Sequence, residues 1–319
     1  MSHNFLSLGI DLGGTKAEIA LVDTKGIVVK DIKIPTRVHE GPEAVAEDII
    51  TASKNLIKES PQKVKAVGAG IAGQISSQGD KVLFAPNLNW TDIPLKNILE
   101  KGLDLPCVLL NDVRAATWGE WLHGAGKGCK DFICIFIGTG IGGGIVTNGH
   151  LMQGYSNTAG ELGHTTLREG GRQCTCGNRG CLEAYAGGWG IAVTVQEAVA
   201  NNPERAKKLL ELAEGDIHKI KGEHLTAAHK LADPLAIEIH NDLIKNLAHG
   251  CVSFVNAFNP QKIIFGGSVA LSHPTFIQEV HQEILRYALK AATAKLESIP
   301  AKLGVKANVI GAAAAATVE

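Results

Sequence analysis

Three cysteines and one histidine occur with the spacing of a metal site. Cys174, Cys176 and Cys181 fall within eight positions, and His164 lies ten residues before the first of them. Thiolate sulfur and imidazole nitrogen are the ligands that tetrahedral Zn²⁺ prefers. Because four protein ligands leave no open position on the metal, we expect a structural zinc and not a catalytic one. The alternative is a group of buried thiols that bind no metal.

Three glycine-rich segments could bind phosphate, because backbone N–H groups can converge there with no Cβ in the way. These segments are residues 11–15 (DLGGT), 138–144 (GTGIGGG) and 266–268 (GGS). Gly138, Gly140 and Gly143 match the dinucleotide-binding fingerprint in form, but they precede a β-branched run where that fingerprint requires a helix. No P-loop motif occurs. A single such segment is often only a tight turn, whereas three, with Thr15 and Thr139 as hydroxyl donors, favour nucleotide binding.

One carboxylate is placed where a general base is needed for phosphoryl transfer to a hydroxyl group. Asp112 follows the apolar run CVLLN and lies beside Asn111. This puts it at the carboxyl end of a predicted strand, where ligands of α/β proteins bind. The alternative is that Asp112 caps the N-terminus of the following helix, VRAATWGEWL, and both roles are compatible.

Alternating strand and helix patterns position these groups and predict an α/β fold. Residues 5–23 read as two strands joined by a glycine turn, and residues 131–149 repeat this pattern about 125 residues later. The repeat indicates two similar halves. Later elements are more helical. Asn202-Pro203 and Asp233-Pro234 each combine a capping residue with proline, so helices are predicted to begin there and to reach Leu212 and about Phe258.

Composition limits the classes of function. The chain has 319 residues, which favours two domains, and a formal net charge of −1 with no basic run, which argues against a nucleic-acid partner. No apolar stretch approaches the ~20 residues of a membrane span. The N-terminal residues lack the pattern of an export signal. We therefore predict a cytoplasmic protein with neither a membrane nor a nucleic-acid partner.

The paired glycine loops resemble those of the actin-like ATPase superfold, which has two ribonuclease H-like domains and an active-site cleft between them. We predict an N-terminal α/β domain at 1–120, completed by about 304–319, and a larger α/β domain at 121–303 with the zinc-binding insertion. The resemblance implies that ATP is the cofactor, that Asp11 helps to position Mg²⁺ and that the third loop flanks adenosine. The implied nucleotide-binding residues are Asp11, Gly13, Gly14, Thr15, Lys16, Gly138, Thr139, Gly140, Gly266 and Gly267.

Motifs along nearly the whole chain resemble those of the ROK family (repressors, open reading frames and sugar kinases). They are DLGGTK (11–16), APNLNW (85–90), Asn111-Asp112, GTGIGGG (138–144), ELGH (161–164) and CTCGNRGCLE (174–183). The resemblance implies ATP-dependent phosphorylation of a hexose or an N-acetylhexosamine, with the 6-hydroxyl as acceptor and Asp112 as catalytic base. It also implies a homodimer and structural Zn²⁺ bound by His164, Cys174, Cys176 and Cys181. The implied sugar-binding residues are Gly73, Asn87, Asn111, Asp112, Glu161, His164 and Glu183.

Two departures from the family pattern leave the substrate open. Ala72-Gly73 stands where the family usually has Pro-Gly, and Arg114 stands where a small or amide residue is commoner. Glucose, N-acetylglucosamine, N-acetylmannosamine, mannose and fructose all remain candidates, and polyphosphate could replace ATP as donor. The alternatives are a sugar-sensing regulator without its own DNA-binding domain, since only ten residues precede Asp11, and a catalytically silent scaffold.

Overall fold

The computed structural model describes residues 5–317 and divides them into two compact units. Unit 1 contains the chain up to Cys129, the segment His150–Gly160 and the chain from Ala301 onward. Unit 2 contains Lys130–Gly149 and Glu161–Pro300. Positions 1–4 of the predicted domain 1–120 and positions 318–319 of the predicted segment 304–319 lie outside the described residues.

Unit 1 is built on a five-stranded sheet in the order β3-β2-β1-β4-β8. The strands are β1 (Leu6–Leu12), β2 (Lys16–Asp23), β3 (Val28–Pro35), β4 (Val64–Ile71) and β8 (Cys107–Asn111). A smaller sheet contains β5 (Gln74–Ile75), β6 (Val82–Ala85) and β7 (Trp90–Ile93). The short strand β11 (His150–Leu151) is not part of this smaller sheet. The strands β1, β4 and β8 are parallel, and Leu12, Ile71 and Asn111 lie side by side at their carboxyl ends.

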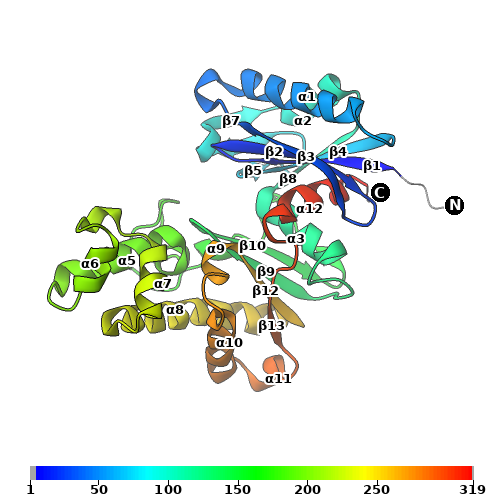
Figure 1. The fold of residues 1–319 in the computed structure, drawn as a ribbon. Coiled ribbons are helices and arrows are strands. Elements are labelled where there is room, and N and C mark those ends of the chain that lie inside the picture. Colours follow the sequence, from blue (N-terminus) through cyan, green and yellow to red (C-terminus); the bar gives the residue numbers. More distant parts are fainter. Residues whose placement is uncertain (1–4, 318–319) are drawn as a thin grey trace. The chain divides into compact units, whose positions relative to one another are not determined.

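Helices cover both faces of the unit 1 sheet. They are α1 (Pro42–Lys58), α2 (Leu95–Leu103), α3 (Asp112–His123) and α12 (Ala307–Ala315). Figure 1 shows α1 and α2 on one face and α3 and α12 on the other. Glycines permit the close approach of α12: a Cβ on Gly9 would lie 2.0 Å from the carbonyl oxygen of Val309, and one on Gly68 would lie 1.7 Å from that of Ala312. The C-terminal helix is therefore part of the core of this unit.

Glu120 links the end of α3 to the segment that precedes α12. Its side chain, on α3, is fully buried. Its two carboxylate oxygens accept hydrogen bonds from the backbone N–H groups of Ala125 (2.7 Å), Lys302 (3.1 Å) and Leu303 (2.7 Å). A buried carboxylate is tolerated when several donors satisfy it. Glu120 thus fixes both the end of α3 and the segment that leads to α12.

Unit 2 is built on a sheet with the strand order β10-β9-β12-β13. The strands are β9 (Phe132–Ile137), β10 (Ile141–Thr147), β12 (Lys262–Gly266) and β13 (Glu297–Pro300). β9 and β10 form an antiparallel hairpin, as β1 and β2 do in unit 1, which confirms the predicted repeat. β12 runs parallel to β9, so Gly266 lies beside Phe136, close to the hairpin turn.

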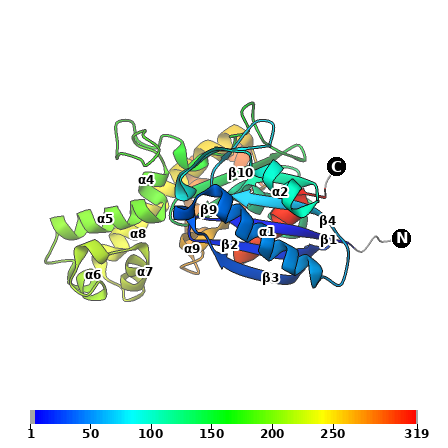
Figure 2. The ribbon, with the colours of Figure 1, turned by 90° about the horizontal axis from the view of Figure 1, so that it is seen from above.

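About half of unit 2 is helical. Its helices are α4 (Glu183–Ala186), α5 (Gly188–Asn201), α6 (Lys207–Leu212), α7 (Gly222–Lys230), α8 (Pro234–Phe258), α9 (Gly267–Ala270), α10 (Phe276–Tyr287) and α11 (Lys290–Thr293). Figure 2 shows α5, α6 and α7 grouped with α8. No helix within residues 5–317 is long and apolar enough to cross a membrane.

The two predicted Asx-Pro helix starts have different outcomes. Asp233 caps α8 by accepting a hydrogen bond from the N–H group of Ala236 (2.8 Å), and α8 ends at Phe258 as predicted. The prediction at Asn202-Pro203 was wrong, because Asn202 follows the end of α5 and its side chain donates to the carbonyl oxygen of Ala198 (3.0 Å). With its amide group used in this way, Asn202 does not cap a new helix, and α6 begins only at Lys207.

Candidate functional site

The turn between β1 and β2 presents the first glycine loop. The Gly13 N–H group donates to the carbonyl oxygen of Lys16 (3.1 Å), and the Thr36 hydroxyl donates to that of Gly13 (2.8 Å). Gly14 packs against Asn87, since a Cβ on Gly14 would lie 2.4 Å from the Asn87 carbonyl oxygen. The loop is therefore held from two sides, and it brings a predicted phosphate-binding residue next to a predicted sugar-binding residue.

Asp11 lies at the end of β1 beside this turn. Its carboxylate accepts a hydrogen bond from Asn308 of α12 (3.1 Å). Burial raises the pKa of Asp11, the Asn308 hydrogen bond lowers it, and Glu18 on the paired strand raises it. Lys16 and Lys33 also lower the pKa of Asp11, but the net shift remains upward. A bound Mg²⁺ would favour the ionised form of this carboxylate.

Asn111 and Asp112 lie where β8 ends and α3 begins. The Asn111 side chain caps α3, accepting from the N–H groups of Val113 (3.0 Å) and Arg114 (3.2 Å), and it donates to the carbonyl oxygen of Gly73 (3.3 Å). The capping interpretation of Asp112 was therefore wrong, because Asn111 performs that role and Asp112 is the first residue of the helix. Asp112 lies at the helix N-terminus, where the backbone dipoles favour a carboxylate.

These side chains gather at one edge of the unit 1 sheet. Because β1, β4 and β8 are parallel and end together, the residues that follow them meet there. The predicted site residues at this edge are Asp11, Gly13, Gly14, Gly73, Asn87, Asn111 and Asp112. Thr15 and Lys16 lie at the exposed end of the same turn.

The second glycine loop, between β9 and β10, is held by Glu183. One carboxylate oxygen of Glu183 accepts from the N–H group of Ile141 (2.8 Å), and the other accepts from the indole of Trp189 (3.1 Å). A Cβ on Gly140 would lie 2.3 Å from the first of these oxygens. Gly138, in contrast, has no atom within 4 Å of the position that a Cβ would take. One side of the loop is therefore packed and the other is open.

The third glycine loop lies beside the second. Gly267 has a φ of +86°, and a Cβ there would lie 2.3 Å from the carbonyl oxygen of Ile137, so only glycine fits. The close approach brings the start of α9 against the end of β9. Gly138, Thr139 and Ser268 line one common cavity as a result.

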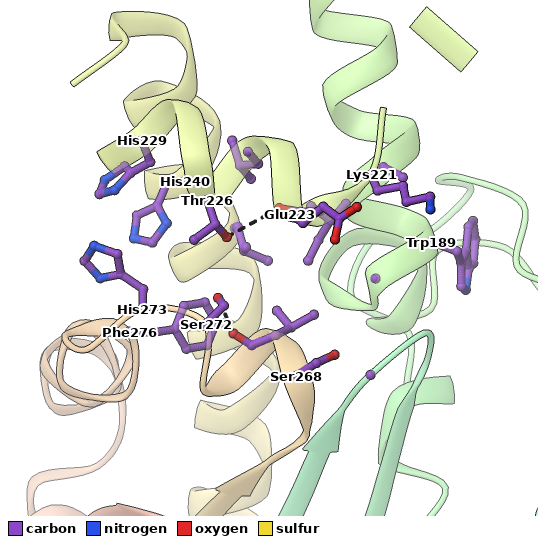
Figure 3. Close-up of a pocket in the computed structure, with 18 of the residues that line it drawn as sticks. Trp189, Lys221, Glu223, Thr226, His229, His240, Ser268, Ser272, His273 and Phe276 are labelled. Atoms are coloured by element: carbon purple, nitrogen blue, oxygen red, sulfur yellow. Dashed lines mark hydrogen bonds between the residues drawn. The ribbon is translucent and has the colours of Figure 1, made fainter. Parts of the chain in front are cut away.

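This cavity, within unit 2, has a volume of about 440 Å³, which is within the range of small-molecule sites. Figure 3 shows Ser268 and Ser272 on one wall, Glu223 and Thr226 of α7 on another, and Trp189 with Lys221 at one end. Apolar side chains complete the lining: Ile191, Ala192, Leu225, Leu243, Val269 and Phe276. Apolar walls with a few polar groups suit a planar heterocycle with hydroxyl substituents.

Three histidines close the opposite end of the cavity. The rings of His229, His240 and His273 point toward one another, with centroids 4.2 to 5.7 Å apart. His240 Nε2 lies 2.7 Å from the carboxylate of Glu279. Burial, followed by the two neighbouring histidines, lowers the pKa of His229. His229 is therefore neutral at pH 7, and its ring is an apolar surface with polar edges.

The structure brings the predicted zinc ligands together. The ligand atoms of His164, Cys174, Cys176 and Cys181 all lie within 4.8 Å of one another. Cys174 Sγ is 3.7 Å from His164 Nδ1, and Cys176 Sγ is 3.7 Å from Cys181 Sγ. Tetrahedral Zn²⁺ with bonds of about 2.0–2.3 Å sets its ligand atoms about 3.6–3.8 Å apart. The residues therefore fit a zinc ion in both chemistry and spacing.

The chain around these four residues is organised to hold them. Burial raises the pKa of Cys181 to about 12, while a hydrogen bond from the Asn178 backbone N–H group lowers that of Cys176. Arg172 donates to the carbonyl oxygens of Ala184 (2.7 Å) and Gly190 (3.1 Å), which ties the cysteine loop to α4 and α5. The loop is therefore anchored to α4, which carries Glu183, and to α5, which carries its partner Trp189.

Glu161 and His164 lie on one short turn of unit 2. The His164 N–H group donates to the carbonyl oxygen of Glu161 (3.1 Å), and Leu162–His164 form a 3₁₀ turn. Because His164 Nδ1 is the nitrogen that faces Cys174, its Nε2 is the atom left for a ligand. The predicted unit 2 residues therefore fall into two groups, one at the cysteine cluster and one at the glycine loops.

Sequence reasoning missed most of the cavity wall. Glu223 and Thr226 come from α7, and Lys221 directly precedes that helix. The histidines come from α7, α8 and the chain before α10. No motif marked these positions, because segments separated by up to about 50 residues meet only in the folded chain. The glycine loops at 138–140 and 266–267 were the local signals for this region.

A family model described as "ROK family" matches residues 7–319. A glucokinase of Streptomyces coelicolor is 34% identical over 309 residues, which covers 97% of this chain and 96% of the relative. A xylose repressor of Bacillus spizizenii is 29% identical over 308 residues, covering 96% of this chain and 75% of that protein.

A solved structure gives the corresponding result in three dimensions. A ROK family glucokinase from Streptomyces griseus, crystallised with glucose and AMPPNP, superposes with a TM-score of 0.83 at 34% identity. The superposition covers 98% of this chain and 99% of that one. The similarity therefore extends over both units and is not confined to one motif.

Proposed function

The chain belongs to the ROK family, and we propose that it transfers the γ-phosphoryl group of ATP to the 6-hydroxyl of a hexose, with Asp112 as general base. ATP-dependent hexose phosphorylation is supported by the end-to-end similarity to glucokinases at 34% identity. The observation that carries the proposal in this chain is the strand-end cluster of Asp11, Asn111 and Asp112 beside the Gly13-Gly14 turn.

The nucleotide is assigned to the glycine loops and the cavity of unit 2. In this proposal the backbone N–H groups of the turns at Gly13-Gly14 and Gly138–Gly140 bind phosphate oxygens, with Thr15, Lys16 and Thr139 as side-chain donors. Adenosine occupies the cavity beside Gly266-Gly267, whose apolar walls and volume suit a purine nucleoside. Asp11 would help to hold Mg²⁺, whose charge would offset that of the phosphates.

The sugar is assigned to polar side chains that the family resemblance implies: Gly73, Asn87, Asn111, Asp112, Glu161, His164 and Glu183. Asp112 would accept the proton of the attacking hydroxyl as the phosphoryl group moves to its oxygen. The Asn111 amide is used for the helix cap and for Gly73, so it also fixes the backbone from which Asp112 projects. Glu183 keeps lone pairs for a sugar hydroxyl beyond its two internal hydrogen bonds.

Zinc is assigned a structural role. His164, Cys174, Cys176 and Cys181 would hold it, and its charge would stabilise the thiolates. Bound through Nδ1, the atom that faces Cys174, the His164 ring would have a fixed tautomer and orientation, which would leave Nε2 for a sugar hydroxyl. His164 would thus link the zinc cluster to sugar recognition.

Measurement of ADP release with a panel of sugars tests the proposal. The panel contains glucose, mannose, fructose, N-acetylglucosamine and N-acetylmannosamine, each with ATP and with polyphosphate as donor. We expect turnover with ATP and glucose, and product analysis should place the phosphate on the 6-hydroxyl. Saturable sugar binding without turnover would instead favour the sugar-sensing regulator, a function suggested by the repressor relative. Sedimentation of the same sample tests the predicted homodimer.

A further inference from the structure

Arg114, in the first turn of α3, is a buried cation. Only 3% of its surface is exposed, whereas arginine is rarely buried without a specific partner. Its Nη1 atom donates to the carbonyl oxygen of Asn157 (2.8 Å), and its Nη2 atom donates to the side-chain oxygen of the same residue. A planar guanidinium that makes two bonds to one residue fixes that residue in direction as well as in distance.

Asn157 passes this constraint to a second segment. Its side-chain nitrogen donates to the carbonyl oxygen of Ser76 (2.8 Å), and its φ of 63° places it in the left-handed region. Ser76 is itself buried, and its hydroxyl donates to Asp80 (2.5 Å). The first turn of α3, the segment His150–Gly160 and the turn after β5 are therefore linked through one arginine and one asparagine.

The start of α3 is linked to residues 73–76 at a second point. Asn111 caps α3 and donates to the carbonyl oxygen of Gly73, three residues before Ser76. The bonds through Asn111 and through Arg114 thus tie the start of α3 to residues 73–76 on both sides of Asp112. Asp112 itself lies between the two tethers in sequence.

We propose that Arg114 is a positioning residue for the phosphoryl transfer, an inference that rests on the proposed function. Its bonds to Asn157 hold the helix turn that carries Asp112 at a fixed distance from residues 73–76 and 150–160. Arg114 does not touch the sugar in this proposal. It acts by setting where Asn111, Asp112 and Gly73 lie.

Three variants separate this role from a purely structural one. Arg114→Met keeps the approximate length of the side chain and removes its hydrogen-bond donors. Arg114→Lys keeps the positive charge but not the planar guanidinium that makes two hydrogen bonds to Asn157. Asn157→Gly removes the side-chain half of the link without strain, because glycine adopts a φ of 63° readily. Asn259→Gly is the matched control, since Asn259 is also left-handed (φ 46°) but lies at the C-terminus of α8.

The measurements are the KM for glucose, the KM for ATP and kcat, together with the melting temperature by circular dichroism. A displacement of about 1 Å can reduce a rate roughly 100-fold. We therefore expect Arg114→Met to raise the sugar KM and lower kcat by about 10-fold each, with the ATP KM changed by less than about 2-fold. Arg114→Lys should recover part of the loss. If Arg114 had a purely structural role, Arg114→Met would lower the melting temperature and the fraction of active protein but would leave the sugar KM unchanged.

The Arg114→Met/Asn157→Gly double variant tests the coupling. Because both changes break one link, its sugar KM should be no higher than that of Arg114→Met alone. An unaltered sugar KM in folded Arg114→Met, or an equal rise in the Asn259→Gly control, would overturn the proposal. If Arg114→Met does not fold, the Asn157→Gly variant tests the proposal instead. A sugar KM equal to that of the wild type in Asn157→Gly would also overturn it. A wild-type protein that is inactive with every sugar would overturn both the proposed function and this inference. If the wild type is active, the variants test the inference about Arg114 alone.

Discussion

Replacing Gly138 by alanine separates nucleotide binding from folding. Gly138 precedes Thr139 in the second glycine loop, and both residues line the unit 2 cavity. A Cβ on Gly138 would meet no protein atom within 4 Å, and the backbone there is not in the left-handed region. The added methyl group would therefore project into the space that the proposal gives to the nucleotide, without disturbing the protein.

Gly138→Ala is expected to stabilise the fold but to weaken ATP binding. Alanine at a compatible backbone position stabilises a protein by about 0.4–1 kcal/mol, because it restricts the unfolded chain. A phosphate held away from the loop loses at least one charge-assisted hydrogen bond, worth about 1.5–3 kcal/mol. That loss corresponds to a roughly 10- to 100-fold weaker affinity for ATP. Gly138→Ala should therefore bind ATP less well while its melting temperature stays level or rises.

Isothermal titration calorimetry with a non-hydrolysable ATP analogue and thermal denaturation on the same sample measure both effects. Gly138→Val extends the series and should weaken binding further, since its branched side chain occupies more of the same space. Sugar binding in the absence of nucleotide is the internal control and should remain near that of the wild type. Unchanged ATP affinity in both variants would refute the assignment of this loop to the nucleotide.

Three further predictions concern other parts of the molecule. Asp112→Asn should leave the fold intact and lower kcat by at least about 100-fold, and near wild-type turnover would remove Asp112 from the role of base. Glu120→Gln should lower the free energy of unfolding by about 1–3 kcal/mol in urea titrations, because an amide NH₂ group would replace one acceptor oxygen of a carboxylate that faces three N–H donors. An unshifted urea midpoint would contradict the role of Glu120 in linking these backbone segments. Cys176→Ser should lose zinc by elemental analysis and raise the sugar KM with little change in the KM for ATP. A folded, zinc-free Cys176→Ser protein with an unaltered sugar KM would reduce the cluster to a remote structural element.

The fold class could be predicted from the sequence. The chain has the two-domain α/β fold of the actin-like ATPases, as its glycine-loop hairpins indicated, and its solved relatives share this fold. The capping residue and proline at Asp233-Pro234 predicted α8 correctly. The same dipeptide type failed at Asn202, whose amide group is used at the end of the preceding helix. A local signal of this kind decides only where no neighbouring segment competes for the same side chain.

The candidate site was predictable to the extent that it is local in sequence. The predicted zinc ligands lie within 18 residues, and their spacing alone anticipated the cluster that the structure shows. The cavity in unit 2 could not be anticipated, because Thr226, His240 and Ser272 belong to separate helices and loops. The Arg114–Asn157–Ser76 link has the same character, since these residues are 38 to 81 positions apart and carry no shared motif.

The glycine loops also have a second role that their sequence does not reveal. In unit 1, Gly14 leaves no room for a side chain against Asn87, and in unit 2, Gly140 leaves none against Glu183. In each unit, therefore, a residue proposed to bind phosphate packs directly against one proposed to bind sugar. A larger residue at either position would displace the proposed sugar-binding residue as well as any phosphate bound by the loop, because the neighbouring atoms lie only 2.3–2.4 Å from the new Cβ. Loss of ATP binding on substitution of Gly14 or Gly140 would not identify a phosphate site, whereas the same loss at Gly138 would, since only there does the new side chain face open space.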